Sequence, residues 1–255
     1  MSIHIGLSPR YEFLRNYIED IPQKFNSLGE IVHKTRNIIR VDNGNNIKLV
    51  IKSYRKIYLF NQLVYAHLLP SKAKRAYLYA RTLIDKGFMT PEPVAYIECV
   101  RKGLMQESYF ISTYTDYTEL KHIAEMLPEE GRKVLEALAR YTHQLHAQNI
   151  YHKDYSVGNI LFSKNGQSYN FTLVDNNRMK FSRSSFAYRM KNLRRLDLPL
   201  PSLAYLCQEY ARLSGQNELL ALSTMLNYRR KRMLFSYRKN KVKHFFRRMF
   251  MPGKA

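Results

Sequence analysis

The sequence predicts an α+β fold in which a small β-rich part precedes a larger helical part. Three observations support this prediction. Two hairpin signals lie in the first half of the chain, a helical pattern separates them, and the second half opens with a long amphipathic pattern from about residue 128 to 147. We find no internal repeat of the length that solenoid proteins show. The chain is therefore expected to form two unlike lobes.

The first half is expected to contain strands, one helix and further strands. In "NIIRVDNGNNIKLVIK", alternating and apolar runs surround Asn43 and Gly44, a pair that favours a tight turn between two strands. Ser71 can cap a helix that runs to about Lys86, where Gly87 would end it. The runs "PVAYIECV" and "LMQESYFISTY" then predict a second hairpin around the short "RKG" turn.

The second half is expected to be mostly helical. Two strand-like runs, "NILF" and "YNFTLVD", flank the turn pair Asn165 and Gly166. We expect an N-terminal lobe over residues 1–115, a helical lobe over 116–227 and a basic tail over 228–255. The first helix of the helical lobe is predicted from side chains that recur at intervals of three and four: Val134, Leu135, Leu138, Tyr141, Thr142 and Leu145.

Composition excludes several classes of protein. With 255 residues, 45% hydrophobic and 13% aromatic, the chain can bury a large core. Cys99 and Cys207 are too few for a disulfide framework and lack the paired spacing of a zinc site. The N-terminus shows no export signal, and the longest weakly polar run, residues 57–69, is too short to cross a bilayer. A cytoplasmic protein is expected.

The net charge of +22 predicts an anionic partner. Between residues 219 and 255 there is no acidic residue, and Arg and Lys alternate with Phe, Met, Leu and Tyr. We favour contact with an anionic membrane surface, because the apolar side chains could enter the headgroup region. A merely solvated basic face is the simpler reading, and specific nucleic-acid binding is not expected.

The stretch "YHKDYSVGNILF" carries the residue types that phosphoryl transfer requires. That reaction needs an oriented acceptor hydroxyl, oxygen ligands for magnesium and a cation on the donor phosphates. Asp154 can orient or deprotonate the hydroxyl, and Asn159 and Asp175 can offer metal-ligating oxygens. Lys52, at the end of "LVIK", can reach the phosphates. The predicted hairpin would bring the oxygens of Asn159 and Asp175 together.

Each of these residues also has an ordinary structural interpretation. Asp154 and Asn159 could cap turns, and Lys52 could be a solvated strand residue. His143 and His146 are expected to be core or surface histidines, because no cluster of Cys or acidic ligands accompanies them. The aromatic residues after Lys52 are expected to pack; they are Tyr54, Tyr58, Phe60 and Tyr65.

The order of "LVIK", "LHAQNIYHKD", the following Asn159 and "LVDNN" resembles the protein-kinase-like superfamily. Within it, "SKAKRAYLYARTLIDKGFMTPEPVAYIE" and "HKDYSVGNILF" are most similar to bacterial lipopolysaccharide kinases that phosphorylate Kdo or core heptose. The resemblance implies a two-lobed kinase-like fold, ATP and Mg²⁺ as cofactors, and a sugar or glycolipid acceptor. It also implies a place at the inner face of the cytoplasmic membrane.

The resemblance assigns a role to four side chains. It makes Asp154 the catalytic base, Asn159 and Asp175 the metal ligands, and Lys52 the lysine that binds the ATP phosphates. It also makes His152 a structural residue that packs the catalytic loop. The sequence has no anchor for a peptide-binding segment after Asp175, so a sugar hydroxyl fits better than a protein hydroxyl, although a protein kinase is not excluded.

Several positions depart from the kinase pattern. The helix expected after Ser71 has no Glu to pair with Lys52; Leu78 stands in the region where that Glu is expected, and Asp85 is the helix's only acidic residue. Gly29 is the lone glycine where kinases have a glycine-rich phosphate loop, and Ser156 replaces a phosphate-binding Lys. Asn176 and Asn177 replace the Phe and Gly that usually follow the metal-binding Asp. These departures motivate the alternative of an inactive pseudokinase with a scaffolding role.

Overall fold

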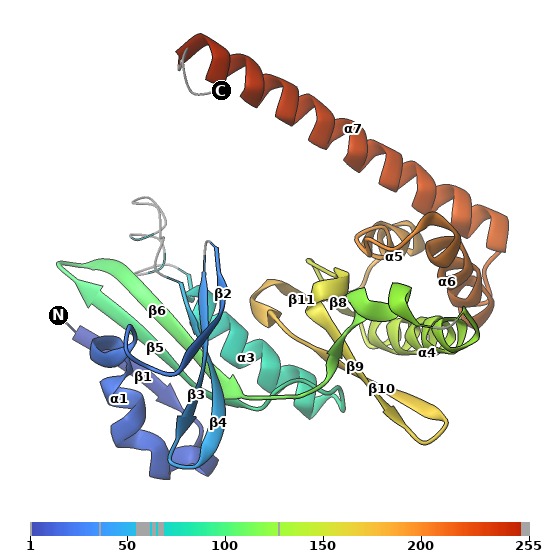
Figure 1. Ribbon diagram of the computed structural model, residues 1–255. Coiled ribbons are helices and arrows are strands. Elements are labelled where there is room, and N and C mark those ends of the chain that lie inside the picture. The colour runs from blue at the N-terminus through green and yellow to red at the C-terminus, as the bar shows by residue number, and fades with distance from the viewer. Residues whose placement is uncertain are drawn as a thin grey trace. The chain divides into compact units, whose positions relative to one another are not determined.

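The computed structural model describes residues 2–35, 37–54, 62, 65, 69–126 and 128–250. The chain divides into two compact units. Unit 1 contains Met1–Glu119, Asn159–Asn165 and Asn170–Met179, and unit 2 contains Leu120–Gly158, Gly166–Tyr169 and Lys180–Ala255. The first unit is built on a sheet and the second on helices (Figure 1), which confirms the predicted α+β class.

Unit 1 is built on a six-stranded antiparallel sheet. Its strand order is β1-β5-β6-β4-β3-β2. Both predicted hairpins are present, as β3 with β4 and as β5 with β6. The turn of the first was predicted around Asp42, Asn43 and Gly44, but these residues belong to β3 and the turn is formed by Asn45 and Asn46, both with positive φ. The strands are β1 (Ser2–Leu7), β2 (Glu30–Lys34), β3 (Ile38–Gly44), β4 (Ile47–Ser53), β5 (Pro93–Arg101) and β6 (Leu104–Thr113).

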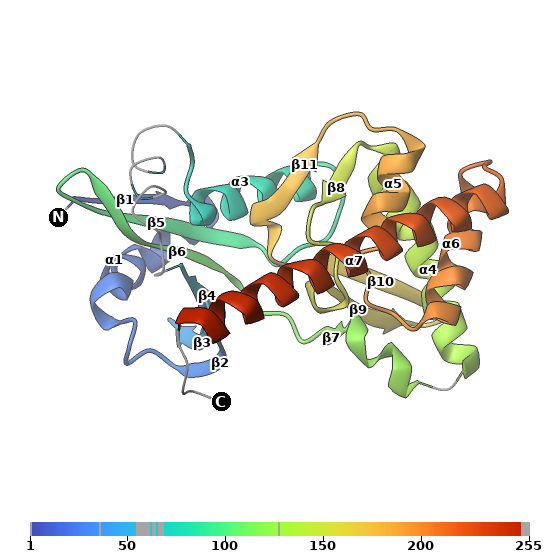
Figure 2. The ribbon, with the colours of Figure 1, turned by 90° about the horizontal axis from the view of Figure 1, so that it is seen from above.

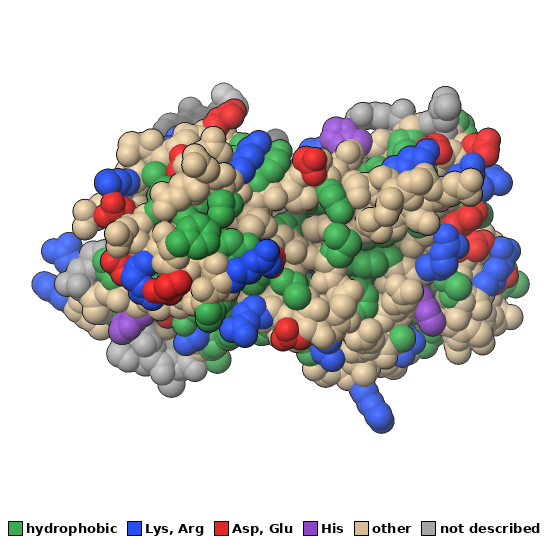
Figure 3. All heavy atoms as spheres, turned by 90° about the horizontal axis from the view of Figure 1, so that it is seen from below, with side chains coloured by type: hydrophobic (Ala, Val, Ile, Leu, Met, Phe, Trp, Pro, Cys, Tyr) green, Lys and Arg blue, Asp and Glu red, His purple; other side chains and the backbone are tan. Residues whose placement is uncertain are grey.

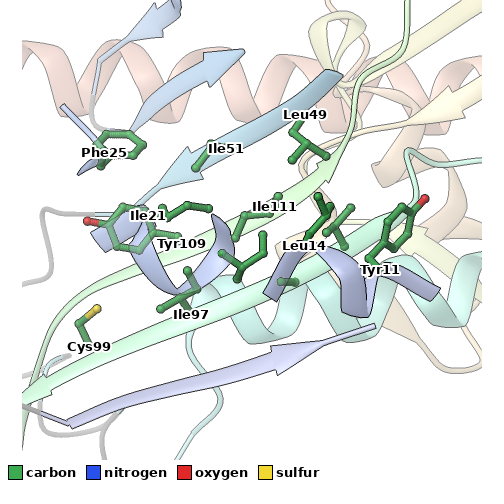
Figure 4. Packing of buried hydrophobic residues seen from close by; sticks show 13 residues of the cluster. Tyr11, Leu14, Ile21, Phe25, Leu49, Ile51, Ile97, Cys99, Tyr109 and Ile111 are labelled. Atoms are coloured by element: carbon green, nitrogen blue, oxygen red, sulfur yellow. The ribbon is translucent and has the colours of Figure 1, made fainter. Parts of the chain in front are cut away.

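The hydrophobic core of unit 1 lies between one face of this sheet and the N-terminal helices. These helices are η1 (Pro9–Leu14) and α1 (Arg15–Lys24). Figure 4 shows Leu14 and Ile21 from the helices packed against Leu49 and Ile51 from β4 and Ile97 from β5. Neither these helices nor β1 was predicted from the sequence.

Helix α3 (Lys72–Asp85) covers the opposite face of the sheet, which follows from the alternation of side chains along β5. Ile97 faces the core described above, whereas Tyr96 contacts the ring of Tyr77 on α3, with 5.4 Å between the ring centres. The predicted cap is present, since the Ser71 hydroxyl accepts a hydrogen bond from the backbone N–H of Lys74 at 3.0 Å.

Unit 1 also takes strands from the second half of the chain. Strands β7 (Thr118–Glu119), β9 (Ile160–Asn165) and β10 (Ser168–Leu173) form a sheet in the order β10-β9-β7. The short helix η4 (Asn176–Arg178) follows β10 and contacts α3. The backbone N–H of Leu173 donates to the carbonyl of Met89 at 3.1 Å. These contacts attach the segment that contains Asp175 to the N-terminal part of the chain.

Unit 2 is built around helix α4 (Pro128–Ala147), which confirms the predicted helix, and α4 packs against α6 (Leu200–Leu213). A small sheet joins β8 (Ile150–His152) to β11 (Met179–Phe181). The remaining elements are η2 (Leu120–Glu125), η3 (Val157–Asn159), α5 (Phe186–Leu193) and α7 (Glu218–Phe250).

Helix α7 is a single unbroken helix that begins before the basic segment (Figure 2). Its first turns pack on α5 and α6 and bury Ala221 and Met225. From residue 230 to 242 every side chain is exposed, among them Met233, Phe235 and Tyr237. Among the helices of the described ranges, none is long and apolar enough to span a membrane.

Candidate active site

Lys52 and Asp175, which are far apart in the sequence, form an ion pair within unit 1. Lys52 lies near the end of β4, and Asp175 follows β10. The Lys52 Nζ lies 2.5 Å from Asp175 Oδ1, and the side chains are only 12% and 25% exposed. The predicted phosphate-binding lysine and one predicted metal ligand therefore meet at one point.

Asn159 lies beside Asp175 because of the pairing of β9 with β10. The chain enters β9 directly after Asn159 and leaves β10 shortly before Asp175, so both residues lie at the same end of this antiparallel pair. The backbone N–H of Val174 donates to the Asn159 carbonyl at 3.0 Å. The structure thus brings together three of the four predicted site residues in unit 1: Lys52, Asn159 and Asp175.

Asn177 and Tyr54 hold the Asp175 carboxylate in place. The Asn177 Nδ2 donates to Asp175 Oδ1 at 2.5 Å and to the Tyr54 hydroxyl at 3.3 Å. Tyr54 is buried, and its ring centre lies 5.6 Å from Lys52 Nζ. Burial raises the pKa of Tyr54 far above its usual value, and the nearby charge of Asp175 raises it further. Tyr54 is therefore a neutral anchor at physiological pH.

Asp175 itself adopts a left-handed backbone conformation, with φ 58° and ψ 44°. Few residues other than Gly and Asn or Asp occupy this region, and such conformations concentrate at functional sites. Sequence reasoning found Asp175 but assigned no role to Asn177 or Tyr54. The one available signal was the Asn at 177 in place of the usual Gly.

The lysine partner that kinases place on the helix after the lysine strand is not supplied by α3. Leu78, in the region where that Glu is expected, is 40% exposed, and Asp85 is exposed at the end of the helix. In this structure the carboxylate that pairs with Lys52 comes from Asp175 instead. Of the other aromatic residues predicted to pack, Tyr65 lies near Arg75, and Tyr58 and Phe60 lie outside the described residues.

Gly29 does not lie in the turn where a phosphate loop would be expected. Strand β2 ends at Lys34 and pairs there with Ile38 at the start of β3, and the register of Ile39 with Lys52 places this end of the hairpin beside Lys52. Gly29 lies at the other end of the hairpin, where an added Cβ would come within 2.0 Å of the Val41 carbonyl oxygen. This glycine serves close backbone packing rather than phosphate binding.

The loop that contains Asp154 belongs to unit 2. The backbone N–H of Asp154 donates to His152 Nδ1 at 3.1 Å, and His152 is buried. The next residue, Tyr155, is also buried and its hydroxyl lies 2.7 Å from Thr142 Oγ1 on α4. The loop is therefore fixed on both sides of Asp154. On the Asp154 side chain, Arg195 Nη1 lies 3.1 Å from Oδ1.

A buried hydrogen-bond network connects this loop to helices α4, α5 and α6. Asn192 on α5 donates from Nδ2 to the His152 carbonyl at 2.9 Å, and its Oδ1 lies 3.0 Å from His146 Nε2. The other ring nitrogen of His146 lies 2.9 Å from the Tyr210 hydroxyl. Burial lowers the pKa of His146 to about 4, so the imidazole is neutral at physiological pH.

His143 and His146 were expected to be core or surface histidines, and His146 is buried. Among the described residues, no group of three or more His, Cys, Asp or Glu side chains could hold a metal ion. Burial lowers the pKa of His143 as well. His146 joins three helices through Asn192 and Tyr210, which accounts for its place on the buried face of α4.

Comparison of the sequence with models of known protein families identifies the family of this chain. Residues 47–216 match the model of the "Lipopolysaccharide kinase (Kdo/WaaP) family", a range that includes all four predicted site residues. The chain belongs to the lipopolysaccharide kinase (Kdo/WaaP) family. This confirms the resemblance drawn from the sequence motifs. No curated protein matches the chain significantly.

A solved structure agrees with this assignment at the level of the fold. The structure of WaaP in complex with acyl carrier protein matches with a TM-score of 0.62 and 17% identity. The match covers 89% of this chain and 98% of the WaaP chain. The kinase fold predicted from the motifs is therefore confirmed, and the family supports a kinase that acts on a lipopolysaccharide sugar.

Proposed function

We propose that this lipopolysaccharide kinase family member transfers the γ-phosphate of ATP to a hydroxyl of Kdo or core heptose. One observation carries the proposal beyond family membership: Lys52 and Asp175 meet at 2.5 Å, with Asn159 beside them. An ammonium group and a carboxylate at one point, with an Asn held by its backbone at the adjacent strand end, are residue types that a metal-bound triphosphate requires.

The residues of unit 1 fit a magnesium–nucleotide complex. Asn159 and Asp175 would hold Mg²⁺ through oxygen atoms, the ligand type that this ion prefers, and the ion would neutralise charge on the phosphates. Lys52 would bind the phosphates as a cation. The hydrogen bond from Asn177 to Asp175 would keep the carboxylate in position for the metal.

Asp154 would act as the general base. As the acceptor hydroxyl oxygen forms its bond to the γ-phosphorus, the bond from that phosphorus to the β–γ bridging oxygen breaks and ADP leaves. The proton of the hydroxyl passes to the Asp154 carboxylate. The loop contacts at His152 and Tyr155 would hold this carboxylate at a fixed orientation.

An anionic glycolipid acceptor agrees with the distribution of charge. On the face shown in Figure 3, Lys and Arg side chains are scattered among polar and apolar surface rather than gathered in one patch. The exposed part of α7, in contrast, combines Arg and Lys with Met233, Phe235 and Tyr237. We propose that α7 contacts the anionic inner surface of the cytoplasmic membrane, where such an acceptor would lie. The solved structure of WaaP contains an acyl carrier protein, which is a second candidate partner for α7. Adding an acyl carrier protein as a competitor in a vesicle-binding assay distinguishes the two partners.

The test of the proposed function is ATP turnover with a purified Kdo-containing lipopolysaccharide acceptor and Mg²⁺. We expect phosphate transfer by the natural protein and a loss of at least about 100-fold in Asp154→Ala and Asp175→Ala. Asp85→Ala, which removes the exposed carboxylate of α3, is the matched control and should leave the rate unchanged. An equal background in all of these proteins would instead support the pseudokinase.

A further inference from the structure

The catalytic loop lacks a basic residue that many kinases place two positions after the catalytic Asp. Ser156 stands at that position, and the residues between Asp154 and Asn159 include no Lys or Arg. A catalytic carboxylate in such a site approaches negatively charged phosphates, and a nearby cation reduces the repulsion between them. Lys153 precedes Asp154, but the segment from Asp154 to Asn159 carries no cation of its own.

Arg195 places a guanidinium beside the Asp154 carboxylate. Its Nη1 lies 3.1 Å from Oδ1 of Asp154, and both residues belong to unit 2. Arg195 lies in the turn that follows α5, and its backbone N–H donates to the Asn192 carbonyl at 3.0 Å. This cation is supplied from a remote part of the sequence rather than from the loop.

The C-terminal end of α5 and the turn after it contact the loop of Asp154 at two points. The buried side chain of Asn192, on α5, donates to the carbonyl of His152, and Arg195, three residues later in the turn, reaches Asp154. Asn192 also contacts His146. The buried contact of Asn192 therefore fixes the end of the helix from which Arg195 extends toward the carboxylate.

The ion pair is exposed enough that a purely stabilising role explains little. The side chains of Arg195 and Asp154 are 29% and 36% exposed. Ion pairs that water reaches contribute little to folding stability. The buried contact of Asn192 with His152 already joins α5 to the loop.

We propose that Arg195 is the positioning residue of Asp154 and replaces the loop cation that Ser156 lacks. It holds Oδ1 and thereby orients the carboxylate toward the acceptor hydroxyl. Its positive charge offsets the repulsion between Asp154 and the phosphates of the bound nucleotide. This inference rests on the proposed kinase function and adds a residue that the motif pattern does not contain.

The test compares kcat and KM for the same acceptor and Mg-ATP in the natural protein and four variants. Arg195→Gln should lower kcat on the order of 10- to 100-fold with less than about a threefold change in either KM, because a misdirected base slows the reaction and not binding. Arg195→Lys should recover part of the loss. Arg195→Gln with Ser156→Lys should also recover part of it, since the new lysine restores the cation within the loop. Arg140→Gln, which removes an exposed arginine of α4, should match the natural protein.

Thermal unfolding of each variant shows whether the fold is intact. If Arg195→Gln fails to fold, Arg195→Lys with its kcat and KM, and Arg195→Met, which keeps the packing of the stem, take its place. A kcat within about threefold of the natural value for Arg195→Gln overturns the inference. So does a loss that neither lysine restores, or a loss that lies mainly in KM, which would make Arg195 an acceptor-binding residue. A natural protein without any turnover overturns the proposed function, and this inference with it.

Discussion

Single residues determine how Lys52 and Asp175, the proposed phosphate-binding lysine and metal ligand, are held. In the absence of a helix Glu, Lys52 pairs with Asp175, and Asn177 links that carboxylate to the buried Tyr54. Asn177 and Tyr54 are both buried polar residues of unit 1, and Asn177 donates hydrogen bonds to the Tyr54 hydroxyl and to the Asp175 carboxylate. Replacement of the usual Gly by Asn therefore supplies an anchor for Asp175 and is not a neutral change.

At the residue scale, His146 predicts an acid sensitivity of folding. Its pKa of about 4 in the folded protein lies below the value of about 6.5 for an unfolded chain. As the pH falls from about 6.5 toward 4, the unfolded chain binds a proton that the folded protein excludes, so stability is lost in this window and not above it. The loss from this residue is about 2 kcal/mol at pH 5.

The check is urea unfolding at pH 7.5 and pH 5 of the natural protein and of His146→Gln. The Gln amide can donate to Asn192 as the His146 Nε2 does, but it does not titrate. We expect the difference in unfolding free energy between the two pH values to be smaller in the variant by about 2 kcal/mol. Equal differences in the two proteins would show that His146 is not the acid-sensitive group.

At the scale of secondary structure elements, the sequence predicted those elements whose signals are local. The two hairpins and helices α3 and α4 were predicted because turn residues, caps and apolar periodicity lie within each element. Strand β1 was missed because its partner β5 lies far along the chain, with Ser2 opposite Val100. Helix α1 was missed because it carries charged residues and an internal Pro22.

The same distinction holds for the candidate site. Lys52, Asp154, Asn159 and Asp175 were predicted because each lies in a short motif of recognisable spacing. Arg195 lies 41 residues beyond its partner in a segment without a motif, so only the fold reveals it. The role of Gly29 was also hidden, because the register of the hairpin determines it.

The hairpin of β2 and β3 predicts that Gly29 resists substitution. Its φ is +23°, and an added Cβ would meet the backbone of Val41 and Asp42. We expect Gly29→Ala to lower the free energy of unfolding by roughly 2–3 kcal/mol, because backbone atoms cannot easily move away.

Gly87→Ala is the matched control, and urea unfolding measures both. Gly87 also has a positive φ, but nothing lies within 4 Å of an added Cβ. Its substitution should therefore cost only about 1 kcal/mol for the left-handed conformation. If the two variants lose equal stability, close packing at Gly29 is not the cause.

At the scale of the whole molecule, the net charge of +22 predicts binding to anionic vesicles through α7. We expect the combined variant Arg238→Glu, Lys239→Glu and Lys241→Glu to bind vesicles of phosphatidylglycerol at least about 100-fold more weakly than the natural protein. Each basic residue near such a surface contributes about 1 kcal/mol, and each reversal also adds repulsion. Co-sedimentation with vesicles measures the change.

The matched control reverses the charge of three exposed basic residues outside α7, namely Lys86, Arg101 and Arg140. This variant has the same net charge as the α7 variant and should keep most of its vesicle binding. Vesicles of neutral phosphatidylcholine should bind neither protein strongly. Equal weakening in both variants would show that net charge, and not α7, determines the interaction.

The path of the chain between the two units has a consequence for how the protein can be dissected. Unit 1 consists of three separate stretches, and the last two, which contain Asn159 and Asp175, come from the second half of the sequence. No single cut can therefore release either unit complete. A fragment that ends at Glu119 would retain Lys52 but not its carboxylate partner, and limited proteolysis should produce fragments that stay associated rather than two autonomous domains.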